Sequence, residues 1–136
     1  MASFHLSIVT PAETVLDEEV ESIVVPGAKG YLGVLANHAP LITPLQPGKM
    51  TIRKSGESDE TVMAISGGFL EVANNVATVL ADATEYPNDI DRERAEAALQ
   101  RARDRLKADA PDIDMGRAMA ASERAKNRLR ILDQYT

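Results

Sequence analysis

The chain has 136 residues, with 21 acidic side chains against 15 Lys and Arg, two His and no Cys. This length allows one compact domain, or a small domain with an appendage. Without Cys there is no disulfide framework, thiolate nucleophile or Cys-based zinc site, and two His leave little for another metal centre. No segment approaches the roughly 18 apolar residues of a membrane span, so we expect a soluble, intracellular protein without a metal.

Charge divides the chain into two unequal parts. Residues 1–91 hold 4 basic and 13 acidic side chains, whereas residues 92–136 hold 11 basic and 8 acidic ones. Nine of the ten Arg lie in the second part, so an anion bound through Arg is expected toward the C-terminal end. The acidic first part argues against nucleic acid as a partner.

Short apolar runs with alternating polarity fill residues 1–85 and are typical of β-strands. Turn-forming pairs such as Pro26-Gly27, Pro47-Gly48, Gly67-Gly68 and Asn74-Asn75 separate these runs. Short strands with turns at intervals of about 8–12 residues predict an antiparallel β-sandwich or barrel. The expected strands cover residues 4–8, 20–25, 31–35, 50–52, 62–65, 69–72 and 76–81.

A different pattern follows the segment Tyr86-Pro87-Asn88-Asp89, whose composition interrupts regular structure. Either Asp89 or Asp91 has the side chain needed to cap a helix, which we expect over residues 90–108. Pro111 ends that helix because proline removes a backbone donor and clashes with the preceding turn.

A second helix is expected over residues 113–132, and the short connection makes the two helices antiparallel neighbours. The sequence therefore predicts an α+β protein. Its parts are an N-terminal antiparallel β-sandwich over residues 1–85, a linker over residues 86–89 and a C-terminal antiparallel two-helix hairpin over residues 90–136.

The predicted contact between the two helices is rich in alanine. Residues 92–136 contain ten Ala but only six Leu and Ile together, so little apolar area is available for burial. Alanine favours helix and allows close approach, so each helix persists while their contact stays weak. We expect a detachable hairpin, with permanent packing as the alternative. The expected stripes are Ala95, Ala98, Leu99, Ala102 and Leu106, and Ala118, Ala121, Ala125, Leu129 and Leu132.

Arginines recur at helical spacing in the hairpin. Arg94 and Arg101 lie seven apart, and Arg117, Arg124 and Arg128 follow a seven-and-four spacing, so each set shares one helix face. Guanidinium groups form charge-assisted, often bidentate bonds to phosphate oxygens, which makes a polyphosphate a chemically suitable ligand. The alternative is a solvated face whose arginines pair with local carboxylates.

Several motifs, in order along the chain, resemble one known family. They are Gly30-Tyr31-Leu32-Gly33-Val34-Leu35-Ala36-Asn37-His38-Ala39-Pro40-Leu41, then Ser66-Gly67-Gly68-Phe69-Leu70-Glu71-Val72, and the Ile-Asp-x-x-Arg-Ala pattern of Ile90, Asp91, Arg94 and Ala95. Together they resemble the epsilon subunit of F-type ATP synthases over essentially the whole chain. Each motif alone is weak, but their order and spacing are specific.

The resemblance implies a role for each half of the chain. The sandwich is expected to join the gamma subunit to the c-ring in the central stalk. The hairpin is expected either to fold up or to extend among the alpha and beta subunits, where it inhibits ATP hydrolysis. Such a subunit is non-catalytic and lies on the cytoplasmic side of the cell membrane, peripheral and attached only through the complex. A stand-alone ATP-sensing module without a rotor role is the alternative.

The resemblance also implies a regulatory ligand, ATP, and no catalytic cofactor. Tyr31 and His38 match positions near the c-ring, although Tyr31 replaces a side chain that is often polar or acidic in the family. His38 is read as a loop or interface residue and not as a catalytic base, because no serine or acid stands at a recognisable partner spacing. The ATP contacts that the resemblance implies are Glu85, Asp91, Arg94, Arg101, Arg124 and Arg128.

Overall fold

The computed structural model describes residues 2–108 and 110–136 and divides the chain into two compact units. Unit 1 is Met1–Glu85 and unit 2 is Tyr86–Thr136. Within the described residues, no helix has the length and apolar character needed to cross a membrane. The predicted α+β class, with strands followed by two helices, is confirmed.

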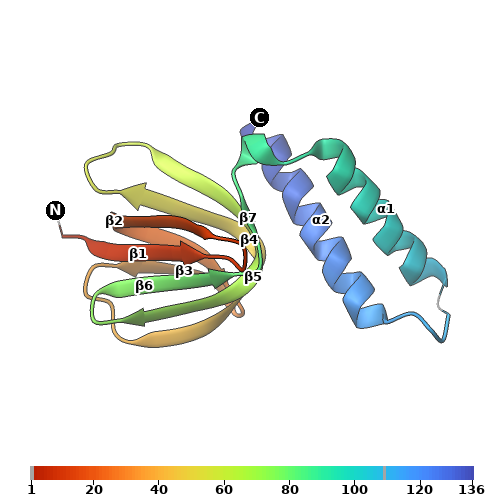
Figure 1. Cartoon of the computed structure of the whole chain (residues 1–136), viewed down its shortest axis with the longest axis horizontal. Coiled ribbons are helices and arrows are strands. Elements are labelled where there is room, and N and C mark those ends of the chain that lie inside the picture. Colours follow the sequence, from red (N-terminus) through yellow and green to blue (C-terminus); the bar gives the residue numbers. More distant parts are fainter. Residues whose placement is uncertain (1, 109) are drawn as a thin grey trace. The chain divides into compact units, whose positions relative to one another are not determined.

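Unit 1 is a β-barrel flattened into a sandwich (Figure 1). The strand order is β1-β6-β5-β4-β2-β3, and β1 also pairs with β2, which closes a ring of five strands. All pairings are antiparallel except that of β1 with β6, which is parallel. The strands are β1 (Phe4–Val9), β2 (Thr14–Gly27), β3 (Gly30–Leu35), β4 (Leu41–Lys54), β5 (Glu60–Ala73), β6 (Val76–Ala81) and β7 (Thr84–Glu85).

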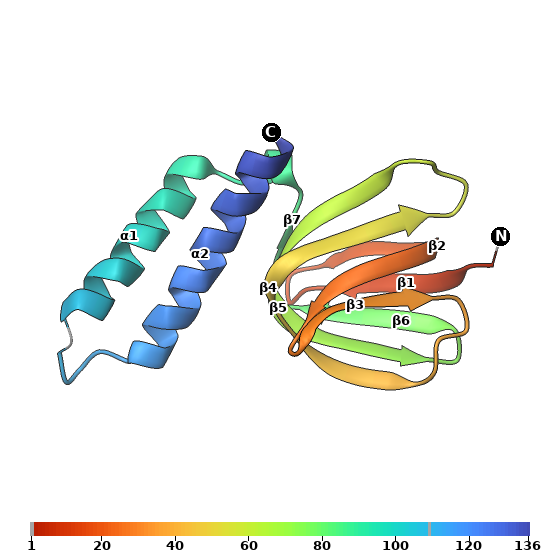
Figure 2. The ribbon, with the colours of Figure 1, turned by 180° about the vertical axis from the view of Figure 1, so that it is seen from behind.

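Two of the residue pairs that predicted turns lie inside long strands instead. β4 runs through Pro47-Gly48 and β5 runs through Gly67-Gly68, so that each strand curves around the barrel (Figure 2). Gly68 has φ 143°, and a Cβ there would lie 2.1 Å from the carbonyl oxygen of Leu80 on β6. The turn prediction was wrong because glycine here allows two strand backbones to approach closely.

The true turn between β5 and β6 is Asn74-Asn75, where both residues have positive φ angles of 52° and 61°. A two-residue hairpin of this type matches the twist of the flanking strands. Asn75 also joins three segments: its Oδ1 accepts from the Asn37 amide at 2.7 Å, its Nδ2 donates to the Ser3 carbonyl at 2.9 Å, and its own carbonyl accepts from the His5 amide at 3.2 Å. One end of the barrel is thereby hydrogen-bonded into a unit.

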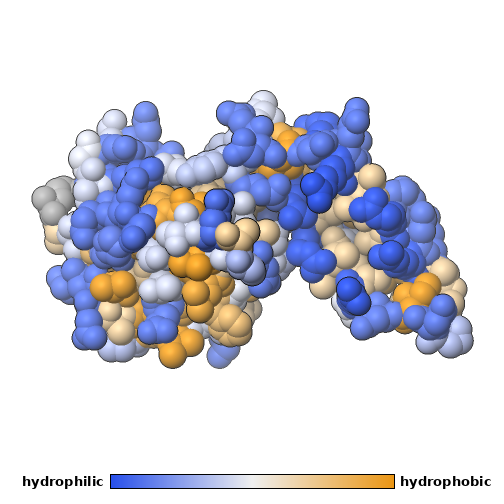
Figure 3. All heavy atoms as spheres, viewed as in Figure 1, coloured by the Kyte–Doolittle hydropathy of each residue, from blue (hydrophilic) through white to orange (hydrophobic). Residues whose placement is uncertain are grey.

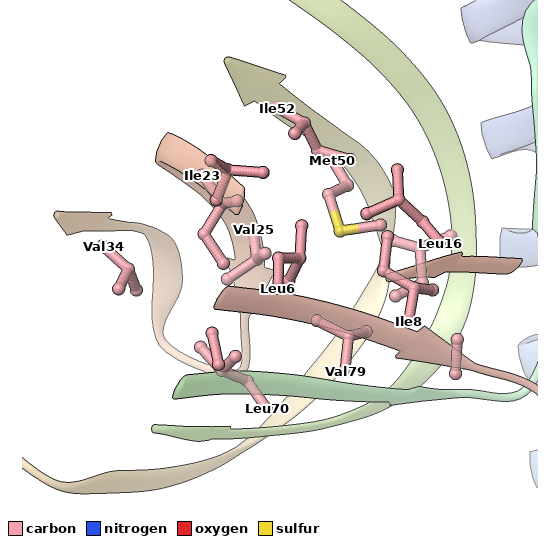
Figure 4. Close-up of a cluster of buried hydrophobic side chains, with 14 of the residues drawn as sticks. Leu6, Ile8, Leu16, Ile23, Val25, Val34, Met50, Ile52, Leu70 and Val79 are labelled. Carbon is pink, nitrogen blue, oxygen red and sulfur yellow. The ribbon is translucent and has the colours of Figure 1, made fainter. Parts of the chain in front are cut away.

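The core of unit 1 consists of the inward side chains of alternating strand positions (Figure 4). Leu6 and Ile8 of β1 point into the same interior as Met50 and Ile52 of β4, and all four are fully buried. The 18 buried apolar residues of this cluster supply the hydrophobic stabilisation of unit 1 without any side chain from unit 2.

Unit 2 is the predicted helical hairpin, with α1 (Arg92–Ala108) and α2 (Met115–Tyr135). Its first residues form a short 3-10 turn, η1 (Pro87–Asp89), which the Ile90 amide closes by donating to the Pro87 carbonyl at 3.2 Å. Asp91 then caps α1, because its Oδ1 accepts from the Arg94 amide at 3.1 Å. The helix therefore begins two residues later than predicted.

The second helix is capped by Asp114, whose Oδ1 accepts from the Arg117 amide at 3.0 Å. It thus starts at Met115 and not at residue 113. Of the expected stripes, Ala98, Leu106, Ala121 and Leu129 are only half-buried. Ala and Ser occupy five of the nine buried positions of the two helices, two of three on α1 and three of six on α2. These positions are Ala95, Leu99 and Ala102 on α1, and Ala118, Ser122, Ala125, Asn127, Ile131 and Leu132 on α2.

Candidate functional site

Two sets of three arginines follow the spacing i, i+7 and i+11 in the hairpin, with an alanine at i+4. Positions with this spacing lie along one side of a helix. We call these sets the arginine ladders. The α1 ladder is Arg94, Arg101 and Arg105, with Ala98 between them, and the α2 ladder is Arg117, Arg124 and Arg128, with Ala121.

The ladders meet at a hollow near the turn of the hairpin. Its volume is about 500 Å³, which is within the range of small-ligand sites. Figure 3 shows one face of the hairpin, where hydrophilic residues along the helices flank a paler strip of less polar ones. The residues lining the hollow are Arg105 of α1, Asp112, Ile113 and Asp114 of the turn, and Arg117, Ala118, Ala121 and Arg124 of α2.

The three guanidinium groups around the hollow have no protein partner within the described part of the chain. There, the side chains of Arg105, Arg117 and Arg124 make neither a hydrogen bond nor an ion pair. The carboxylates of Asp112 and Asp114 also line the hollow, so three positive charges face two negative ones. The net charge of the lining favours an anion.

The opposite end of the hairpin has a different electrostatic contact. Arg92, at the start of α1, donates to Asp133 near the end of α2 at 2.6 Å, and its other nitrogen lies 3.9 Å from Glu96. The hydrogen bond to Asp133 raises the pKa of Arg92 above its ordinary value. This exposed pair links the helices at the end away from the turn and adds little energy to their contact.

The structure places the six predicted ATP contacts in different surroundings. Asp91 uses one carboxylate oxygen as the cap of α1, and its other oxygen remains for a ligand. Arg124 is half-buried in the wall of the hollow. The remaining four, none of which lines the hollow, are Glu85 of β7, half-buried; Arg94 and Arg101 of α1, exposed; and Arg128 of α2, half-buried.

Arg105 was not singled out from the sequence, and Arg117 was grouped with Arg124 by spacing but is not one of the six predicted ATP contacts. Both line the hollow with Arg124. A signal for them existed in the sequence. Arg105 extends the spacing of Arg94 and Arg101 by a further four residues, which places all three on one side of α1. The sequence did not show which end of each ladder lies beside a cavity, because that depends on how the two helices pack.

The two predicted interface residues lie at opposite ends of β3. Tyr31, at its start, is 60% exposed, and its hydroxyl oxygen accepts from the Lys49 amide at 3.1 Å. His38 follows the strand after a turn at Asn37, and its Nδ1 lies 2.7 Å from the carbonyl oxygen of Ala39. The strand thus presents the two residues at separate places on the barrel surface.

An exposed apolar surface on unit 1 was not predicted. Phe69 of β5 lies opposite Pro44 of β4 on one side and Leu80 of β6 on the other, and Phe69 and Leu80 are 54% and 51% exposed. Apolar residues also gather on the part of unit 1 that carries β6 in Figure 3. Exposed apolar surface of this kind marks protein contacts. Exposed Glu71 and half-buried Thr78 lie between Val76 and the row formed by Phe69 and its two neighbours. We define the apolar face as Ile42, Pro44, Phe69, Val76 and Leu80.

His5 of β1 stands between two carboxylates of β2. Its Nε2 pairs with Asp17, its Nδ1 lies 3.4 Å from Glu19 Oε1, and Glu19 is its direct partner in the strand register. The hydrogen bond with Asp17 is the main reason that the pKa of His5 is raised above its ordinary 6.5. The cluster therefore holds β1 against β2 most strongly when His5 is protonated.

A barrel with an exposed apolar face and a hairpin rich in arginine are features of a small binding protein. Two family descriptions match the chain: the ATP synthase delta/epsilon chain beta-sandwich domain over residues 3–87, and the long alpha-helix domain of the same chain over residues 88–133. The chain belongs to the ATP synthase delta/epsilon chain family.

Relatives and solved structures agree with this assignment. The ATP synthase epsilon chain of Moorella thermoacetica is 49% identical over 82% of both chains, and that of Caldicellulosiruptor bescii is 44% identical over 82% of this chain and 80% of the relative. A chain in the cryo-EM structure of Euglena gracilis mitochondrial ATP synthase (OSCP/F1/c-ring) matches with a TM-score of 0.84 and 25% identity, over 97% of this chain and 82% of that one. The prediction of an epsilon-type ATP synthase subunit is confirmed.

Proposed function

We propose that this chain is a non-catalytic rotor subunit that joins gamma to the c-ring and restrains ATP hydrolysis through its hairpin. It would lie on the cytoplasmic side of the cell membrane, attached only through the complex. Membership of the family supports this role, as does the likeness to a chain from a complex described as OSCP/F1/c-ring. The proposal includes no cofactor for catalysis.

The apolar face is the proposed contact with gamma. Its exposed aromatic and aliphatic side chains come from three adjacent strands, so a partner meets a rigid sheet and not a loop. A shallow groove of about 370 Å³ beside it is lined by five apolar residues, among them Leu41 and Ile42, and by Glu71. Removing this area from water on binding would contribute about 25 cal/mol per Å² of apolar surface before the costs of association.

The alanine-rich contact between α1 and α2 is the observation that carries the regulatory part. Five of the nine buried positions in the two helices are Ala or Ser, whose burial removes little apolar area from water. A contact of this strength is suited to a two-state element, because a few kcal/mol of differential binding shifts its population. The folded hairpin and an extended form among the alpha and beta subunits are the proposed states.

ATP is the proposed ligand of the folded state. The proposed contacts combine carboxylates for the adenine amine or ribose hydroxyls with arginines for the phosphates. A ligand that binds only the folded hairpin stabilises it by RT ln(1 + [ATP]/Kd), about 2.7 kcal/mol at one hundred times Kd. The six proposed contacts are Glu85, Asp91, Arg94, Arg101, Arg124 and Arg128.

A deletion after Asn88 tests the rotor and regulatory roles together. The remaining residues keep the complete core of unit 1, so the truncated chain is expected to fold and to bind gamma with unchanged affinity. In a complex rebuilt from alpha, beta and gamma, the full chain should lower ATP hydrolysis and the truncated chain should not. Equal inhibition by both chains would place the inhibitory element in unit 1.

A double variant, Arg124→Ala with Arg128→Ala, tests the nucleotide contacts. We expect weaker ATP binding in calorimetry and stronger inhibition at low ATP, because the ligand no longer holds the hairpin folded. Arg103→Ala with Arg130→Ala removes the same charge from exposed positions outside the ladders and is the matched control.

The alternative function is a stand-alone ATP sensor. Binding of ATP by the unmodified chain without binding of gamma would favour this alternative.

A further inference from the structure

We propose that the Arg92–Asp133 ion pair is a conformational clasp. Each of its two charges stabilises the hairpin while the helices are paired, and each destabilises the end of its own helix once the helices separate. The first turn of α1 and the last turn of α2 are then helical in the paired hairpin and frayed in the separated one. Both charges belong to unit 2, so this property is independent of the rotor role and of the ATP contacts.

The clasp joins two side chains that are 41 residues apart in the chain. Arg92 is the first residue of α1, and its Nη2 donates to Oδ1 of Asp133 at 2.6 Å. Asp133 lies in the last turn of α2, which ends at Tyr135. A charge-assisted hydrogen bond of this length has a narrow range of geometries. It therefore forms only while the start of α1 lies beside the end of α2.

Each charge of the clasp lies at the unfavourable end of its own helix. The N-terminus of a helix carries partial positive charge, and the C-terminus carries partial negative charge. Arg92 therefore weakens the start of α1, and Asp133 weakens the end of α2, whose last turn contains no basic side chain. In the paired hairpin, Arg92 lies beside the negative end of α2 and Asp133 beside the positive end of α1. Pairing thus makes two unfavourable charges favourable.

A second ion pair in the hairpin does not depend on pairing. Lys126 Nζ lies 3.5 Å from Glu123 Oε1, and both residues belong to α2, so separation of the helices leaves this contact in place. Glu96 of α1 does not take over the role of Asp133, because it lies 3.9 Å from Arg92 and both side chains are exposed. The Glu123–Lys126 pair is therefore a matched control for the clasp.

Two backbone hydrogen bonds report whether the end turns are helical. The Ala95 amide donates to the Asp91 carbonyl at 3.0 Å in the first turn of α1, and the Thr136 amide donates to the Leu132 carbonyl at 3.0 Å at the end of α2. Hydrogen exchange at these two amides measures how often each end turn opens. The measurement uses the full chain.

Removal of one charge should have opposite effects in paired and separated helices. In the unmodified hairpin, Arg92→Gln should lower protection of the Ala95 amide about two- to fivefold, because the clasp is lost. Ala125→Asp separates the helices, because it places a charge at a position that is 1% exposed. In that background, Arg92→Gln should raise protection of the same amide about two- to fivefold, because a positive charge leaves the N-terminus of α1.

The other charge and the control complete this comparison. Asp133→Asn should show the same reversal of sign at the Thr136 amide. Lys126→Gln should change protection in α2 in the same direction in both backgrounds, because its partner Glu123 is on the same helix. Effects of Arg92→Gln and Asp133→Asn that keep one sign in both backgrounds would overturn the clasp.

A double-variant cycle in the unmodified hairpin gives a measurement that does not need separated helices. Arg92→Gln and Asp133→Asn together should lower protection no more than either change alone, because both break the same contact. Losses that add in the double variant would show that the two charges act independently, and the proposal would be wrong. If Ala125→Asp leaves no helix to measure, this cycle decides the question.

Discussion

Leu99→Ala tests whether the hairpin is held by very few side chains. Leu99 is 9% exposed and is the one large buried side chain among the described residues of α1. Its truncation removes about 2.4 kcal/mol of transfer free energy, at about 0.8 kcal/mol for each of three carbons, and leaves a cavity besides. We therefore expect a loss of about 3 kcal/mol, or roughly a hundredfold in the equilibrium between paired and separated helices.

Amide hydrogen exchange on the full chain measures this effect in each unit separately. Protection in α1 and α2 should fall by up to about a hundredfold, while protection in β1 to β6 stays unchanged, because the core of unit 1 contains no hairpin residue. Met119→Ala, at a position 59% exposed on α2, is the control and should change protection little. Unchanged exchange in the helices, or an equal fall in the strands, would refute the reasoning.

Three further predictions concern single positions. Gly68→Ala should destabilise unit 1 by several kcal/mol in thermal unfolding, because φ is 143° and the new Cβ would lie 2.1 Å from the Leu80 carbonyl oxygen. A stability equal to that of the unmodified chain would contradict the geometry. Asp91→Ala should lower the stability of the hairpin by about 1 kcal/mol, because the cap of α1 is lost. Asp91→Ser should restore the cap without restoring the carboxylate. Normal ATP affinity in the Ser variant would therefore exclude a carboxylate contact with ATP. His5→Gln should lower the free energy of unfolding below pH 6.5, and this difference from the unmodified chain should vanish as the pH rises through the raised pKa of folded His5. The difference should be small because the group is exposed. A difference that grows with pH would contradict the raised pKa.

The sequence predicted the order of strands and helices well because apolar periodicity reports which residues face a core. It failed at Gly48 and Gly68, because the same residue type serves a turn and a close contact between strands. A Cβ at Gly48 would lie 2.6 Å from the Pro26 side chain and 2.9 Å from the Tyr31 hydroxyl. The parallel pairing of β1 with β6 has no local signal, since the two strands are far apart in the chain.

The candidate site shows the same division between local and spatial information. Helical spacing was sufficient to group the arginines of each helix. It could not show that Arg105 lines a cavity with Arg117, because that depends on how the turn between the helices is formed. The apolar face was also missed, because outward strand positions carry no signal that separates an exposed Phe69 or Leu80 from a buried one.

Asn75 has a consequence for how the barrel would meet a partner. The amide group of this one side chain fastens the backbone at Asn37, directly before His38, to the backbone of Ser3 near the start of the chain. The segment leading to His38 is thus preorganised, and docking there would cost little ordering entropy. A rigid surface of this kind is suited to transmitting torque to a partner without deforming.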